Sequence, residues 1–168
     1  MIRAQPGLVH LIGSVPLAST ADVFRTLATT LGDRLSRMPD GETGERRRWM
    51  WWQRTMLERH PATEVDRDTP PIEIRQWDGV VLRRSELFRL RDGVDPDTVD
   101  FPTGYAEAAF DSWSRFDALR RAGVIGACTR FQVCLPTPMS SAFMYVSPRS
   151  HDDYMRAYER ALLRALAD

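Results

Sequence analysis

The sequence predicts an α/β fold in which short apolar strands alternate with helices, as in about the first half of a (β/α)8 TIM barrel. Three observations lead to this class. Residues 8–14 form a nearly continuous apolar run that ends in Gly-Ser, a pattern typical of a parallel strand covered on both faces. The predicted order is strand, helix, strand, helix, insert, helix, strand, helix. The chain has 168 residues, fewer than the roughly 200–250 of a complete barrel.

The elements of the first third follow from start, stop and spacing signals. Ser19 precedes Asp22 by three residues, which is a capping-box spacing, and apolar residues follow at helical intervals until Gly32. We expect a second strand over residues 34–38. A helix with an aromatic stripe then follows over residues 45–59.

The rest of the chain is predicted as an insert followed by a return to the core. Residues 61–99 are rich in turn formers and extended runs, which predicts an inserted β-hairpin. A helix is expected after Pro102, and a third core strand over residues 129–135. A last helix begins near Ser150 and continues to the end of the sequence. We therefore expect residues 1–168 to form a single domain, with the insert over approximately 61–99.

Composition narrows the function classes. The 23 basic and 23 acidic residues balance, so no global charge favours binding to nucleic acid or to an anionic membrane. Every basic residue is an arginine, which excludes a Schiff-base lysine or a phosphate-loop lysine in this sequence. No apolar run approaches transmembrane length, and the first residues lack the apolar core of a signal peptide. We expect a cytoplasmic protein.

The acidic turn at residues 38–45 is the strongest candidate for a functional site. It has the sequence MPDGETGE and places Asp40, Glu42 and Glu45 between a strand and a helix. Carboxylates at a helix start are favoured by the helix dipole, so capping and turn formation explain one or two of these acids. On spacing alone, ligand binding by Glu42 and Ser14 is an equal alternative.

Three segments resemble the catalytic barrel of cobalamin-independent methionine synthase. Residues 11–16 (LIGSVP) resemble its first-strand motif, residues 40–46 (DGETGER) resemble the turn after its second strand, and residues 131–139 (FQVCLPTPM) resemble a later strand and turn. Their order and spacing agree with that family over nearly the whole chain. Together they are also similar to methionine-synthase-like bacterial proteins without an assigned function.

The resemblance implies roles for particular residues. Ile12, Gly13 and Ser14 would hold the carboxylate of a homocysteine-like substrate, and Glu42 would bind its ammonium. The chemistry agrees, because backbone N–H and hydroxyl groups donate to a carboxylate and a glutamate pairs with an ammonium. Further candidate ligand contacts are Asp40, which stands where the synthase has histidine, Thr137 in a proline-rich turn, and Phe143 or Tyr145 near the folate-stacking position.

The resemblance also implies a zinc ion and a folate. In that family the zinc ligands lie in the second half of the barrel, which this sequence does not include. Cys128 and Cys134 are not at zinc-site spacing, and we interpret them as ordinary thiols. We therefore predict no metal site made by this chain's residues. The reactive zinc thiolate would come from a missing half or a separate chain.

Two functions from different classes follow, together with a third within the same superfamily. The first is a component of a methyltransferase that binds a thiol amino acid, completed by a second chain or by a copy of itself. The second is a non-catalytic half-barrel that binds a ligand or a partner. The third is a metal-free decarboxylase similar to the porphyrinogen enzymes. The Arg46–Arg48 run beside Trp49 favours a solvated helix face over a nucleic-acid surface.

Overall fold

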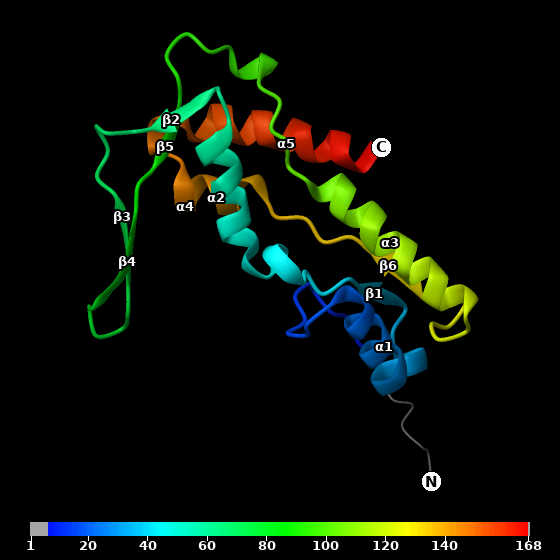
Figure 1. Cartoon of the computed structure of the whole chain (residues 1–168). Helices are drawn as coiled ribbons and strands as arrows, with labels where there is room; N and C mark the ends of the chain where they lie inside the picture. Colours follow the sequence, from blue (N-terminus) through cyan, green and yellow to red (C-terminus); the bar gives the residue numbers. More distant parts are fainter. Residues whose placement is uncertain (1–6, 168) are drawn as a thin grey trace. The chain divides into compact units, whose positions relative to one another are not determined.

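The computed structural model describes residues 7–167 as two compact units. The first unit comprises the chain up to Trp49 together with Ala106–Cys134, and the second comprises Met50–Tyr105 together with Leu135–Asp168. Figure 1 shows the elements in sequence colours. Each unit has its own hydrophobic core, and each is described here by itself. The assignment of residues 1–168 to one domain stays a prediction.

The first unit combines helices with a short parallel pair of strands. It contains α1 (Thr20–Leu31), β1 (Arg37–Pro39), the 3₁₀ turn η2 (Gly44–Arg48), most of α3 (Tyr105–Arg121) and β6 (Arg130–Gln132). Strand β1 pairs in parallel with β6, with Met38 opposite Phe131. The predicted first strand makes only a single parallel bridge, between Val9 and Leu35.

Local sequence explains why α1 forms where it does. The Ser19 hydroxyl accepts a hydrogen bond from the backbone N–H of Asp22 at 3.2 Å, as the capping-box spacing predicts. Val23, Phe24 and Leu27 then share one buried face of the helix. That face packs into the core of the first unit with Phe116 from α3 and Met38 from β1.

The second unit combines helices with two antiparallel strand pairs. Its helices are α2 (Trp49–Arg59), α4 (Pro138–Tyr145) and α5 (His151–Ala167). Strand β2 (Thr63–Val65) pairs with β5 (Phe88–Leu90), and β3 (Ile72–Arg75) pairs with β4 (Val81–Ser85). Short 3₁₀ turns cover Pro96–Thr98 (η3) and Pro148–Ser150 (η4). A further short 3₁₀ turn, η1, covers Gly32–Arg34 and belongs to the first unit.

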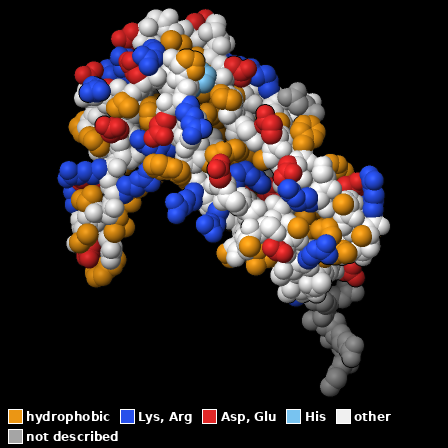
Figure 2. Space-filling model, in the orientation of Figure 1, with side chains coloured by type: hydrophobic (Ala, Val, Ile, Leu, Met, Phe, Trp, Pro, Cys, Tyr) orange, Lys and Arg blue, Asp and Glu red, His pale blue; other side chains and the backbone are white. Residues whose placement is uncertain are grey.

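The β3–β4 hairpin confirms the extended runs expected within the insert. It extends away from the β2–β5 pair as a two-stranded ribbon (Figure 1). Apolar side chains are exposed along it (Figure 2), where Trp77 is 92% exposed and Leu82 is 62% exposed. The run around Phe88, however, pairs with β2 and not with the hairpin.

The half-barrel prediction is wrong. Half of a (β/α)8 barrel needs about four parallel strands side by side in one sheet. In the described part of the chain every sheet has two strands, and only β1 and β6 pair in parallel. Hydrophobic periodicity indicates where several of the helices and strands lie, but it does not specify which strand pairs with which. The extended runs of the insert, between Thr63 and Leu90, pair with each other as antiparallel strands, so they do not supply the parallel strand pairs that a barrel needs.

The core of the second unit contains a hydrogen-bonded polar group. Gln53 is 1% exposed; its side-chain amide donates to the Tyr105 hydroxyl at 3.1 Å and its carbonyl accepts from Tyr158. Burial raises the pKa of Tyr158, so this hydroxyl stays protonated and able to donate. Satisfied polar groups of this kind add directional contacts to a core built otherwise from apolar and aromatic side chains.

Asp66 in the second unit should make the free energy of unfolding depend on pH in the acidic range. Burial raises its pKa, but hydrogen bonds from Thr69, the Asp68 backbone N–H and Arg149 outweigh that effect and lower the pKa from 3.8 to about 2. Between these values the unfolded chain binds more protons than the folded one, so the free energy of unfolding should fall as pH drops from about 4 to about 2. Urea titrations across this range measure the slope.

The matched variant for that measurement is Asp66→Asn. It removes the titrating carboxylate, so it should be less stable than the natural protein at neutral pH and lose less stability on acidification. An unchanged acid slope in Asp66→Asn would show that other carboxylates produce it.

Candidate functional site

Asp40 anchors the turn that begins where β1 ends. Its carboxylate is 6% exposed and accepts hydrogen bonds from the Ser112 hydroxyl at 2.7 Å and from the Glu42 backbone N–H at 3.0 Å. It also pairs with the guanidinium of Arg46. A buried carboxylate needs such partners to stay charged. Asp40 therefore holds the turn in place from within the first unit, and its oxygens are already engaged.

Glu42 has an unusual backbone conformation in this turn. Its φ of +50° is the only positive value among the non-glycine residues that the structure describes. Such a conformation is uncommon for a residue with a side chain and is retained when its surroundings impose it. Here the neighbouring Asp40 accepts the Glu42 N–H. The backbone conformation of Glu42 therefore fixes the direction in which its side chain extends from the turn.

The structure brings Glu42 together with the Gly13–Ser14 segment, as the sequence predicts. The Ser14 hydroxyl donates a hydrogen bond to the Glu42 carboxylate. A Cβ built on Gly13 would lie only 3.3 Å from the carboxylate carbon of Glu42, so this segment approaches the carboxylate closely. The Val15 N–H donates to the Gly41 carbonyl at 2.9 Å and joins the two segments. The third predicted residue of this segment, Ile12, is 88% exposed.

Donor and acceptor groups lie next to each other at this junction. Within residues 7–167, the backbone N–H groups of Gly13 and Ser14 have no backbone hydrogen-bond partner. The half-buried Glu42 carboxylate accepts from Ser14 and retains further acceptor capacity, because an ionised carboxylate has about four lone-pair sites. The junction can therefore present N–H donors to an anion and a carboxylate to a cation.

Two residues that sequence reasoning missed or treated as ordinary lie near this junction. Gln132 donates to the Leu11 carbonyl at 2.8 Å and to the Cys134 sulfur at 3.3 Å, while its own side-chain oxygen is buried without a partner among the described residues. Burial raises the pKa of the Cys134 thiol, and the nearby carboxylates of Glu42 and Asp40 raise it further. Cys134 is therefore held as a neutral thiol. The one sequence signal for Gln132 is a polar side chain between the apolar Phe131 and Val133 of the predicted strand.

The remaining sequence candidates belong to the second unit. Thr137 is exposed immediately before α4, and Phe143 is 57% exposed with its ring 4.8 Å from that of His151. Tyr145 is 3% exposed and packs in the core, with the Arg54 guanidinium 5.8 Å from its ring centre. The burial of Tyr145 favours a structural role. Contact of Thr137 or Phe143 with a ligand at Glu42 stays a prediction.

The described residues do not fit a zinc site. No group of three or more His, Cys, Asp or Glu side chains within residues 7–167 is arranged to hold a metal ion. Zinc binding through cysteine needs a thiolate, whereas the Cys134 environment favours the protonated thiol.

A pocket of about 290 Å³ lies beside the same turn. Thr43, Arg46 and Ser112 line it together with Arg115 from α3. Both guanidinium groups already pair with carboxylates, Arg46 with Asp40 and Arg115 with Asp111. Their charges are therefore compensated within the unit, and the open donors remain those at Gly13 and Ser14.

Comparisons with protein-family models, with curated proteins and with solved structures found no match for this chain. The resemblance to methionine synthase thus rests on the three sequence motifs. No helix among the described residues is both long enough and apolar enough to cross a membrane.

Proposed function

We propose that the first unit binds the amino-acid end of a small molecule, with Glu42 pairing with the ammonium group. The observation that carries this proposal is the junction of Glu42 with Gly13 and Ser14, two segments 28 residues apart in sequence that share a hydrogen bond. The ligand carboxylate would take the N–H groups of Gly13 and Ser14. Charge-assisted hydrogen bonds of both kinds are among the strongest single contacts a small ligand makes.

A thiol amino acid such as homocysteine is the first ligand to test, and methyl transfer to its sulfur is the reaction that the motifs suggest. A non-catalytic amino-acid-binding role is the second candidate. It needs only the junction of Glu42 with Gly13 and Ser14, which the described residues already form. Detection of methylated product with a folate donor would separate the two.

Glu42→Gln is expected to weaken L-homocysteine binding by about 1.5–3 kcal/mol, because the amide keeps the shape of the side chain but loses the charge that pairs with the ammonium. Isothermal titration calorimetry on the full chain under reducing conditions measures this change. The matched control is Glu45→Gln, which removes an exposed carboxylate of the same turn and should leave the affinity unchanged.

A second ligand tests the carboxylate half of the site. The compound 3-aminopropanethiol has the ammonium and the thiol but no carboxylate, so it should bind more weakly than homocysteine. Equal affinities for the two ligands would remove the assigned role of Gly13 and Ser14. The proposal would be contradicted if the Glu42 and Glu45 variants lost homocysteine affinity equally, or if the natural protein did not bind homocysteine.

A further inference from the structure

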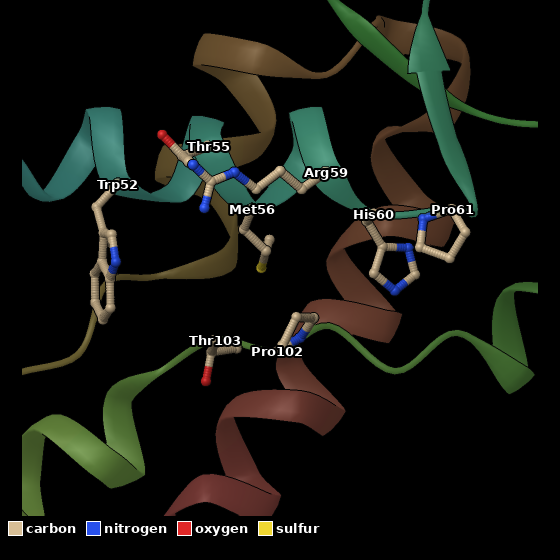
Figure 3. Close-up of a pocket in the computed structure, with 8 residues that line it drawn as sticks. All are labelled: Trp52, Thr55, Met56, Arg59, His60, Pro61, Pro102 and Thr103. Atoms are coloured by element: carbon tan, nitrogen blue, oxygen red, sulfur yellow. The ribbon is translucent and has the colours of Figure 1, made fainter.

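The second unit contains a pocket that the amino-acid site does not use. It has a volume of about 260 Å³ and lies between α2 and the segment that precedes α3. Figure 3 shows Trp52 and Met56 from α2 facing Pro102 and Thr103 from that segment, with His60 and Pro61 on one side. Ligand pockets usually measure roughly 300–1,000 Å³, so this one suits a ligand with about one ring.

The Trp52 ring forms one wall of the pocket, and it is held in place. A Cβ built on Gly104 would lie 2.7 Å from Cζ2 of Trp52, so the indole occupies the space that any side chain at residue 104 would need. The Tyr105 ring also contacts it edge to face, with the ring centres 4.9 Å apart, and Trp52 packs against the core of the second unit. A pre-positioned aromatic face loses little conformational entropy when a flat ligand packs on it.

The charged lining of the pocket is one arginine. No acidic side chain lines the pocket, and Arg59 at the end of α2 is the one arginine that does. Among the described residues Arg59 forms no ion pair. In Figure 3 its side chain extends along α2 towards Thr55. A guanidinium without a carboxylate partner matches a carboxylate in charge and geometry.

His60 offers the pocket no free nitrogen. Its Nδ1 accepts from the Ala62 backbone N–H at 3.2 Å, so its Nε2 is the donor to the Asp100 carbonyl at 3.0 Å. Its ring packs on Phe101, with the ring centres 4.8 Å apart. His60 therefore contributes a neutral ring edge, and the charge preference of the pocket comes from Arg59.

We propose that this pocket binds a small aromatic carboxylate, with the ligand ring packed between Trp52 and Pro102 and its carboxylate paired with Arg59. The walls supply apolar contact for a flat ring, and Arg59, which forms no ion pair within residues 7–167, supplies the preference for an anion. An organic cation could also stack on an indole face, but Arg59 would repel it and no acid is present in the lining to hold it.

Three probes of equal ring size test this assignment: benzoate, neutral benzyl alcohol and cationic benzylamine. Titration of the full chain, followed by calorimetry or by saturation-transfer NMR, should show that benzoate binds most tightly. Arg59→Gln should weaken benzoate binding about tenfold or more and leave benzyl alcohol unaffected, because only the charged contact is lost. Arg67→Gln, at an exposed arginine of the same unit outside the pocket, is the matched control.

The location of the site is tested by Gly104→Ala. The added methyl group would displace the Trp52 ring, so this variant should weaken benzoate and benzyl alcohol alike, with far-UV circular dichroism checking that the unit still folds. Equal binding of benzoate and benzyl alcohol to the natural protein, or equal effects of Arg59→Gln and Arg67→Gln, would overturn the proposal. Absence of saturable benzoate binding would do the same.

Discussion

Replacing Phe116 with alanine is expected to lower the free energy of unfolding by about 3–5 kcal/mol, the usual cost of removing a fully buried aromatic ring. Phe116 is 0% exposed in the core of the first unit. Its ring centre lies 5.5 Å from those of Phe24 and Phe131 and 5.7 Å from that of Trp113. Alanine would leave a cavity that three ring partners line, which adds to the lost transfer free energy. Urea unfolding followed by far-UV circular dichroism measures the effect.

Phe110→Ala provides the matched control on the same helix. Phe110 is 56% exposed, and the substitution changes helix propensity by the same amount as at Phe116. It should alter stability by no more than about 0.5 kcal/mol, as surface substitutions usually do. Similar losses in the two variants would mean that Phe116 is not the centre of a packed core.

Gly41→Ala is expected to destabilise the first unit by about 2–5 kcal/mol, the sum of backbone strain and overpacking. Gly41 has a φ of +80°, and a Cβ there would lie 2.6 Å from Cγ2 of the buried Val23. Gly44 is the matched position, since it has a φ of +67° in the same turn but open space where the Cβ would go. Gly44→Ala should therefore lower the free energy of unfolding only by the cost of the backbone strain.

The two glycine variants also report on the proposed binding site. The Gly41 carbonyl accepts from the Val15 N–H, so displacing it should weaken homocysteine binding, whereas Gly44→Ala should not. Urea unfolding and calorimetry on the same samples provide both measurements. If Gly41→Ala lowers the free energy of unfolding by no more than Gly44→Ala does, then the close contact with Val23 is not the reason that residue 41 must be glycine.

The helices with a clear apolar face were predictable from sequence. Val23 and Phe24 in α1, and Tyr154 and Tyr158 in α5, are buried as their spacing indicates. Leu166 lies four residues after the buried Leu162, at a spacing that puts the two on one face of α5, but it is 58% exposed because the core of the second unit does not extend to the end of that helix. Spacing predicts which side of a helix is apolar, but not how far the neighbouring elements cover it.

Some elements gave no usable sequence signal. Helix α4 begins at Pro138, the last residue of the Pro136-Thr137-Pro138 segment. The two prolines of this segment predict a loop. Proline is also well suited to the first turn of a helix, and this is the position that Pro138 takes. The β2–β5 pair joins runs more than twenty residues apart, and their register depends on contacts made across the second unit. This antiparallel pairing is also why the half-barrel expectation failed.

The sequence by itself determined the local features of the candidate site. The glycines and acids of residues 38–45 predict a tight turn after a strand, and this turn follows β1 in the structure. It depends on short-range backbone preferences and side-chain chemistry. The roles of Ser14 and Glu42 in ligand binding stay a prediction, although the two side chains share a hydrogen bond.

Only the tertiary structure decided how that site is supported. Ser112, which donates to the buried Asp40, lies 72 residues away in sequence, and Gln132 reaches back 121 residues to Leu11. It also decided which strands pair, and it placed Trp52 and Arg59 in one pocket. Contacts of this kind depend on how separate elements pack within a unit, and packing is a property of the folded chain as a whole because no local pattern of residues encodes it.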